Sequence, residues 1–342
     1  MKMQKIKHKG ARLNTNMFRK ANSWAASYIE DAIMQAGSIA ILGHVRPDGD
    51  DVGSCLGLYN YIKIIHPDAK VIVFLEEFSS DFNFLRGANN VRSDYTSDEC
   101  FDLAFTMDCA EPSRIGGFAK YMESAKKKIC IDHHITSDGS GYDLAVISPD
   151  RSSTCETLCT VIDMERLDKE TAECIYLGIV HDTGVFKHDN TGFETHIYAG
   201  KLASLGVRTE YIIDQTFYKK TFAANRALGK ALIEAKLLLD GKLIYSVFTR
   251  EMMEEYQVKR ADLDGVIDQL RVTEGCLCAL FIYETEEGGT FKVSLRANGP
   301  IDVSIIAKKF GGGGHVKAAG CDIKASPNEI IDMISLEIAK QI

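Results

Sequence analysis

The sequence lacks the features that mark several classes of protein. No window reaches the apolar length of a membrane span, so we expect no contact with a membrane. The basic, polar segment Met1–Lys20 lacks the apolar core of a signal peptide, which predicts a cytoplasmic protein. The 10 cysteines have no regular spacing, which argues against a disulfide framework. A net charge of -8 argues against a broad basic surface for long duplex nucleic acid, although a short anionic substrate fits.

The pattern of the first half predicts an α/β fold. Apolar strand-like runs alternate with helical segments, which indicates a mainly parallel sheet flanked by helices. At 342 residues the chain exceeds the usual limit of one hydrophobic core, so we expect residues 1–205 to form only the first domain. Its expected strands are residues 38–44, 69–75, 102–108 and 127–132, and its expected helices are residues 21–36, 52–65 and several within 152–205.

The second half predicts a smaller C-terminal α/β domain. Residues 206–225 are a predicted linker with some helix, and residues 226–342 form the second domain, which we expect to lie across a cleft from the first. Its expected strands are residues 242–249, 276–284 and 290–298, and its expected helices are residues 227–240, 262–271, 302–310 and one at the C-terminus.

Four segments of the first half carry oxygen and imidazole ligands without thiolate. Such ligands suit manganese, magnesium or iron better than structural zinc, and they point to a two-metal hydrolase of phosphate esters. Three of the segments begin at the carboxyl end of a predicted strand, where parallel sheets collect ligands. The residues are His44, Asp48 and Asp50; Asp108; Asp132, His133 and His134; and Asp182.

Most of these motifs also have a structural interpretation when taken alone. Asp50 and Asp51 could complement the dipole of the helix that follows them. Asp108 could cap a turn, and Asp182 lies at a predicted helix end. The adjacent His133 and His134 are harder to explain by packing, and they favour metal or phosphate binding. In the second domain, the glycine run before His315 could bring backbone N–H groups close to a phosphate, or could be a flexible connector.

The motifs together resemble the DHH phosphoesterase superfamily. GHVRPDGD, the aspartate of TMD, the DHH triplet and HDTG occur in the order of its four motifs, and GGGGHVKAAG resembles its associated C-terminal domain. Within the superfamily, the chain looks most like the NrnA-type oligoribonucleases, which also remove the 3′-phosphate of adenosine 3′,5′-bisphosphate. The resemblance implies substrates that are short single-stranded oligoribonucleotides and mononucleotide bisphosphates, and it suggests a homodimer.

The resemblance also implies a role for each site residue. One metal would be held by His44, Asp48 and Asp108, and the other by Asp50, Asp108, His133 and Asp182. His134 would face the scissile phosphate, and Asp132 would orient the histidines. Substrate would be bound by Arg114 and Ser153 of the first domain and by Arg296, Gly313, Gly314 and His315 of the second. Ser153 equally fits a helix cap, since it starts an apolar helical run.

Two metal ions imply direct attack by a bridging hydroxide, without a covalent enzyme intermediate. Mn²⁺ is the expected metal, with Mg²⁺, Co²⁺ and Fe²⁺ as alternatives. An inorganic pyrophosphatase or exopolyphosphatase of the same superfamily is the main alternative function, but the C-terminal half shows the run from Gly311 to His315 instead of a basic Ser-Arg-Lys type motif. A catalytically silent nucleotide-binding regulator is a second alternative. The sequence leaves the native metal, the direction of degradation and the base preference open.

Overall fold

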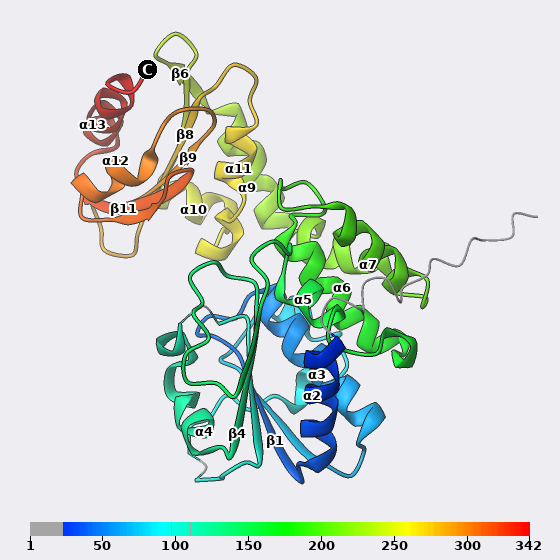
Figure 1. Ribbon diagram of the computed structural model, residues 1–342. Coiled ribbons are helices and arrows are strands. Elements are labelled where there is room, and N and C mark those ends of the chain that lie inside the picture. Colours follow the sequence, from blue (N-terminus) through cyan, green and yellow to red (C-terminus); the bar gives the residue numbers. More distant parts are fainter. Residues whose placement is uncertain (1–22, 97, 110) are drawn as a thin grey trace, which may run out of the picture. The chain divides into compact units, whose positions relative to one another are not determined.

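The computed structural model describes residues 23–342 apart from residues 97 and 110 (Figure 1). The chain divides into two compact units, Met1–Tyr218 and Lys219–Ile342. The basic segment Met1–Lys20 lies outside the described residues. None of the described helices combines the length and apolar character of a membrane-spanning segment. The division falls inside the predicted linker, but that stretch is largely helical, with α8 at Thr209–Ile213 and a π-helix at Asp214–Tyr218.

The first unit is built on a five-stranded sheet in the order β2-β1-β3-β4-β5, and all neighbouring strands are parallel. This confirms the predicted α/β fold with a parallel sheet. The fifth strand was not predicted, because its four residues are too short a run to stand out. The strands are β1 Ser38–Leu42, β2 Lys70–Phe74, β3 Leu103–Met107, β4 Lys127–Asp132 and β5 Leu144–Ile147.

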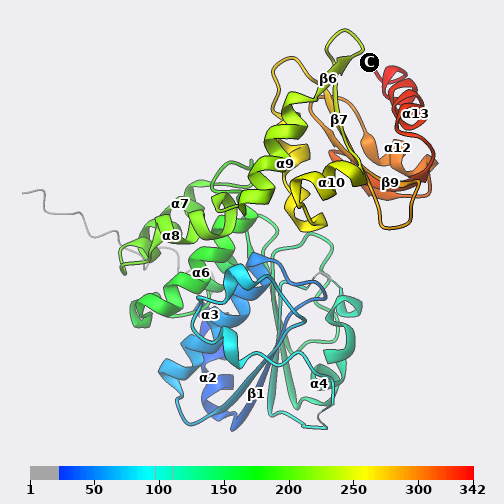
Figure 2. The same cartoon turned by 180° about the vertical axis from the view of Figure 1, so that it is seen from behind.

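Helices cover both faces of this sheet (Figures 1 and 2). On β1, Ile39 and Ile41 join the larger core with α2 and α3, while Ala40 and Leu42 pack in a smaller core beside α4. Burial on both faces explains why the central strands are continuous apolar runs in the sequence. The helices are α2 Ser23–Gln35, α3 Gly49–Ile65, α4 Ala119–Ser124, α5 Thr154–Cys159, α6 Lys169–Asp182 and α7 Phe193–Ala203, and short 3-10 helices lie at Ser80–Phe82, Ala88–Asn90, Pro112–Phe118 and Met164–Arg166.

Glycines let α3 and α6 lie unusually close together. A Cβ on Gly53 of α3 would lie 2.6 Å from the carbonyl oxygen of Cys174 on α6, which is closer than real Cβ atoms come to backbone. A Cβ on Gly178 of α6 would lie 2.6 Å from Oδ1 of Asp50 on α3. Because α6 ends at Asp182, this close packing also brings its C-terminus towards the start of α3.

The second unit contains a six-stranded sheet in the order β10-β11-β9-β8-β7-β6, in which only the β7–β8 pair is parallel. Core residues of α12 and α13 pack on one face, and those of α9 and α11 pack on the other. Figures 1 and 2 show this layering. The elements are α9 Phe222–Ile233, β6 Lys236–Leu238, β7 Leu243–Phe248, α10 Arg250–Tyr256, a 3-10 helix at Arg260–Leu263, α11 Val266–Arg271, β8 Cys278–Glu284, β9 Thr290–Ala297, α12 Val303–Lys309, β10 Gly313–His315, β11 Ala318–Lys324 and α13 Pro327–Ala339.

Several predicted boundaries in this unit are wrong. The helix expected over residues 227–240 ends at Ile233, and part of the remainder forms the edge strand β6. The helix expected over residues 262–271 is interrupted at Gly265, whose φ is +88°. Strands β10 and β11 were missed because glycine and alanine are depleted in strands and mask the alternating pattern.

Candidate metal centre

The predicted ligands of the first unit come together at the carboxyl edge of its sheet. His44 follows β1, Asp108 follows β3 and Asp132 ends β4, so these residues share one edge because the strands are parallel neighbours. Their ligand atoms form three overlapping groups, each with all atoms within 4.8 Å of one another. The groups are His44, Asp48 and Asp108; Asp50, His133 and Asp182; and Asp108, His133 and His134.

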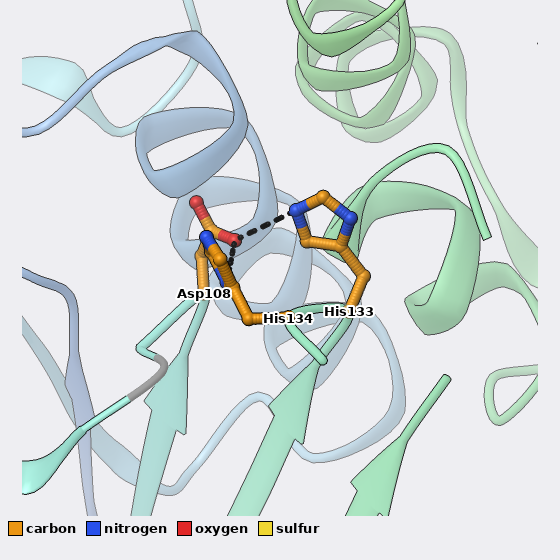
Figure 3. A group of neighbouring side chains, drawn as sticks. All are labelled: Asp108, His133 and His134. Atoms are coloured by element: carbon orange, nitrogen blue, oxygen red, sulfur yellow. Dashed lines mark ion pairs between the residues drawn. The ribbon is translucent and has the colours of Figure 1, made fainter. Parts of the chain in front are cut away.

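The carboxylate of Asp108 occupies the middle of the cluster. Its Oδ2 lies 3.6 Å from Nε2 of His44, and its Oδ1 lies 3.5 Å from Nε2 of His133. On either side, Nε2 of His44 is 4.0 Å from Oδ1 of Asp48, and Nε2 of His133 is 3.1 Å from Oδ2 of Asp182. Figure 3 shows His133 and His134 both directed at Asp108. One carboxylate therefore joins two ligand groups.

The backbone of Asp108 takes a conformation that residues other than glycine rarely adopt. Its φ of +54° lies in the left-handed region, which Asp tolerates better than most residues. The amide of Asp108 still donates to the carbonyl of Ile131 on β4, at 3.1 Å. The chain therefore turns sharply while the sheet continues, and strain of this kind is concentrated at functional sites.

The start of α5 holds two of the clustered carboxylates. Asp50 is fully buried, and its oxygens accept the backbone amides of Thr154 at 2.6 Å and Cys155 at 2.9 Å. The hydroxyl of Thr154 donates to Oδ1 of Asp108 at 2.9 Å. The role of the two backbone amides was not predicted, because backbone donors leave no residue-type signal in a sequence.

The loop after β1 is fixed by two further aspartates. Asp48 caps α3 and accepts the amides of Asp50 and Asp51 with Oδ1, at 3.0 and 3.2 Å. Asp51 is fully buried and accepts the amide of His44 at 3.1 Å. Asp51 was assigned only to the helix dipole from sequence; the run of acidic residues in DGDD was the available signal.

Asp132 forms hydrogen bonds with both histidines that follow it. Its Oδ1 accepts the backbone amides of His133 and His134, at 2.7 and 3.2 Å, and lies 2.8 Å from Nδ1 of His134. The contact with Asp132 uses Nδ1 of His134 and does not involve Nε2. Nδ1 of His133 lies 3.4 Å from the carbonyl of Arg151 instead. The orienting role of Asp132 stays a prediction.

The substrate-binding residues predicted in the first unit differ in their surroundings. Nη2 of Arg114 lies 3.1 Å from Nδ1 of His44, so its guanidinium is beside the cluster. Ser153 is fully buried, and its hydroxyl accepts the amide of Glu156 as the N-cap of α5. The helix-cap interpretation accounts for Ser153, and its contact with substrate stays a prediction.

Of the residues predicted in the second unit, Arg296 and His315 have their side chains on one face of its sheet, and Gly313 and Gly314 precede His315 on β10. His315 of β10 pairs with Ala318 of β11, and Ala318 pairs with Arg296 of β9, so the three side chains form a row. His315 and Arg296 are two strands apart, which corresponds to about 10 Å, and only the methyl group of Ala318 lies between them. Nε of Arg296 also contacts Oδ1 of Asp268 at 3.2 Å.

Comparison with known proteins agrees with these motifs. Residues 38–179 match the model of the DHH family N-terminal domain, and residues 240–340 match the DHHA1 domain. A relative from Thermus thermophilus, named bifunctional oligoribonuclease and PAP phosphatase NrnA, is 32% identical over 84% of this chain and 85% of its own length. The chain belongs to the DHH family.

Other relatives extend the match to structure. The Bacillus subtilis protein of the same name is 28% identical and covers 84% of this chain and 89% of its own length. The crystal structure of an exopolyphosphatase-related protein from Bacteroides fragilis superposes with a TM-score of 0.81 at 25% identity, covering 93% of this chain and 96% of that chain. The DHH fold therefore extends over nearly the whole chain.

The charges of the clustered aspartates and histidines suit divalent cations. Burial raises the pKa of Asp50, and the nearby carboxylates of Asp108 and Asp182 raise it further. Burial lowers the pKa of His133, but the carboxylates of Asp182, Asp50 and Asp108 outweigh burial and raise it to about 10. A carboxyl group that resists ionisation and an imidazole that keeps its proton are both signs of crowded carboxylates, and bound cations would take the place of these protons.

The donor atoms around the DHH cluster fit hard metals. The grouped ligand atoms belong to carboxylates and imidazoles. Cys55 and Cys155 lie nearby, but burial raises the pKa of both thiols. The charge of Asp51 raises the pKa of Cys55 further, and the charge of Asp50 raises that of Cys155. Neutral thiols are poor ligands, so this residue set could hold ions such as Mn²⁺ or Mg²⁺.

Proposed function

We propose that this protein is a two-metal phosphoesterase that hydrolyses short oligoribonucleotides and removes the 3′-phosphate of adenosine 3′,5′-bisphosphate. The observation that carries the proposal is the position of Asp108 between the ligand pair His44–Asp48 and the group of Asp50, His133 and Asp182. The names of the relatives from Thermus thermophilus and Bacillus subtilis support both activities.

Two divalent ions, with Mn²⁺ as the first candidate, would supply an activated water nucleophile and neutralise charge on the departing oxygen. Asp108 would hold both ions, the remaining ligands would hold one each, and no covalent enzyme intermediate would be needed. Nδ1 of His134 donates to Asp132, and this hydrogen bond raises the pKa of His134, which favours the imidazolium form. In that form Nε2 of His134 would donate to a phosphate oxygen. The guanidinium of Arg114 beside His44 would bind the same phosphate.

The second unit would recognise the substrate. The proposed binding residues are Arg296, Gly313, Gly314 and His315, and Arg296 offers the planar donor pair that suits phosphate. The substrates would be short and single-stranded, because a net charge of -8 provides little general attraction for long nucleic acid. A cytoplasmic location and a homodimer stay predictions.

A substrate panel tests this function. Phosphate or nucleotide release is measured side by side from adenosine 3′,5′-bisphosphate, a diribonucleotide and pyrophosphate, with Mn²⁺, Mg²⁺, Co²⁺ or chelator. We expect release from the two nucleotides with Mn²⁺, and none with chelator. No release from any substrate with any metal would contradict the assignment as an enzyme and favour a silent nucleotide-binding regulator.

A pyrophosphatase or exopolyphosphatase is the second candidate. The similarity to the exopolyphosphatase-related protein from Bacteroides fragilis supports it. The same panel separates the two candidates, because preferential hydrolysis of pyrophosphate over both nucleotides would replace the first proposal with the second.

A further inference from the structure

A buried carboxylate lies behind the metal centre, outside every ligand group. Glu156 of α5 is 1% exposed. Its Oε2 accepts the amide and hydroxyl of Ser152, at 3.2 and 2.6 Å, and the hydroxyl of Thr195 on α7, at 2.8 Å. Its Oε1 accepts from Nη1 of Arg151 at 3.1 Å. The carboxylate of Glu156 therefore accepts hydrogen bonds from the segment just before α5 and from α7.

That segment, residues 151–155, touches the proposed ligands at several points. The carbonyl of Arg151 lies 3.4 Å from Nδ1 of His133. As described above, the amides of Thr154 and Cys155 hold Asp50, and the hydroxyl of Thr154 reaches Asp108. Residues 151, 154 and 155 thus contact three proposed ligands, which are Asp50, Asp108 and His133.

A fourth ligand is connected to the same segment. Nδ2 of Asn190 donates to the carbonyl of Ser152 at 3.1 Å and to the carbonyl of Asp182 at 3.2 Å. The position of Ser152, which Glu156 fixes through both its amide and its hydroxyl, therefore bears on the backbone that carries Asp182.

We infer that Glu156 is a positioning residue for the metal centre, acting through residues 151–155 on Asp50, Asp108, His133 and Asp182. Backbone carbonyls and amides orient ligands only as well as the backbone itself is fixed, and outer partners of this kind strongly affect metal affinity. A buried carboxylate is costly unless fully hydrogen-bonded, and here its partners are the segment that holds the ligands. The inference rests on the proposed two-metal function.

The test compares Glu156→Gln with a matched control, Glu173→Gln. Glu173 of α6 is also a buried carboxylate, 3% exposed, and is bound by Arg208 through Nε and Nη2, both at 2.7 Å. None of its described hydrogen bonds involves a proposed ligand. Both substitutions remove the charge of a buried carboxylate that is paired with an arginine of the same unit, so a general loss of stability would affect both.

Metal binding and local exchange are measured for the full-length chain. Titration with Mn²⁺ is expected to show 10- to 100-fold weaker binding in Glu156→Gln, and wild-type affinity in Glu173→Gln. In the metal-free protein, we expect the amides of Thr154 and Cys155 to exchange with deuterium about tenfold faster in Glu156→Gln only. In turnover, kcat should fall more than KM rises.

Equal Mn²⁺ affinity and equal exchange in the two variants would overturn the positioning role and leave Glu156 a stabiliser of the fold. If Glu156→Gln does not fold, Thr195→Val removes one donor to the carboxylate, and the same two comparisons decide. The Mn²⁺ titration and the exchange measurement use no nucleotide substrate, so a failed substrate panel leaves these two comparisons intact. If the wild-type chain bound no Mn²⁺, the proposed function would fail, and the exchange rates alone would still test the link from Glu156 to residues 154–155.

Discussion

At the scale of single residues, the centre depends on one carboxylate with an unusual backbone. Asp108 is 2% exposed and interacts with three histidines, which outweigh the effect of burial and lower its pKa. Asp108 therefore stays ionised. Asp50 and Asp182 ionise less readily, because burial is the largest cause that raises their pKa values. Asp108 thus suits the role of a shared ligand.

Replacing Asp108 by alanine should abolish nearly all hydrolysis. Removing one partner of a buried charge network costs about 4 kcal/mol, which corresponds to roughly a 1,000-fold loss of rate if it falls on the transition state. The rate on a diribonucleotide with Mn²⁺ measures this, with Asp94→Asn, at an exposed ion pair, as the control. Wild-type turnover by a correctly folded Asp108→Ala protein would exclude the shared-ligand role.

Metal affinity should rise with pH. The pKa of His44 is about 9, because Asp108 and Asp51 outweigh the effect of burial, and that of His133 is about 10. Below these values both imidazoles hold protons in the metal-free protein, and a cation must displace them. We expect stronger Mn²⁺ binding at pH 9 than at pH 7, with proton release detected by calorimetry in buffers of different ionisation enthalpy. Affinity independent of pH would contradict imidazole ligation.

The same shifts affect the stability of the metal-free protein in the opposite direction. A histidine whose pKa is raised on folding stabilises the native state fully below about pH 6.5, its unfolded pKa. That contribution from His44 and His133 is lost as pH rises through about 9 to 10. Bound Mn²⁺ should therefore raise the melting temperature most at alkaline pH.

The sequence allowed the clustered side chains to be predicted but not what holds them. Aspartates and histidines directly after buried strands have a recognisable residue type and position. The amides of Thr154 and Cys155 have neither, because any residue offers an amide. Nothing in the sequence distinguishes Glu156 from other acidic residues, and only the fold shows its contact with Thr195.

At the scale of elements, the approach of α3 and α6 brings distant ligands together. Gly53→Ala should force the helices apart, because the new Cβ meets backbone at 2.6 Å. Overpacking of this kind costs about 1–3 kcal/mol, and here we expect weaker Mn²⁺ binding in addition. The control is Gly200→Ala on α7, where nothing lies within 4 Å of the new Cβ and stability should rise by about 0.5–1 kcal/mol. Thermal unfolding and Mn²⁺ titration measure both; equal stability of the two variants would contradict the packing argument.

The glycine run before His315 serves backbone packing more than the sequence suggested. A Cβ on Gly312 would lie 2.1 Å from the carbonyl oxygen of Gly320, whereas one on Gly313 would meet nothing within 4 Å. Gly312→Ala should therefore destabilise the protein by about 2 kcal/mol. Gly313→Ala should leave stability nearly unchanged and raise KM for a diribonucleotide, because the methyl group would obstruct a ligand there. Denaturant unfolding and steady-state kinetics measure the two effects, and unchanged KM in Gly313→Ala would remove Gly313 from the substrate site.

Elements were predictable where their burial is uniform. β1, β3 and β4 are almost entirely buried, so their apolar runs indicated both the strands and the ligands at their ends. β6 and β10 have three residues each and are mostly exposed, which leaves little hydrophobic pattern to detect. These edge strands form because their neighbours supply hydrogen bonds, which is tertiary information.

At the scale of the whole molecule, the proposed function assigns metal binding to one unit and substrate recognition to the other. The proposed metal ligands all belong to the unit that ends at Tyr218, and Arg296 and His315 belong to the other. Changes in the second unit should therefore alter substrate affinity without altering metal binding.

Arg296→Ala tests this division. A charge-assisted hydrogen bond to phosphate contributes about 1.5–3 kcal/mol, so KM for a diribonucleotide should rise roughly 10- to 100-fold while Mn²⁺ affinity stays unchanged. Arg271→Ala is the matched control, since Arg271 also lies beside Asp268, with Nε 3.9 Å from Oδ1. Equal KM values for the two variants would show that Arg296 acts only on the fold.

Anomalous diffraction from crystals of the whole chain soaked in Mn²⁺ tests the central claim most directly. We predict two manganese peaks, one bound by His44 and Asp48 and the other by Asp50, His133 and Asp182, with Asp108 bound to both. Crystals that show no peak, or a peak away from Asp108, would contradict the two-metal centre.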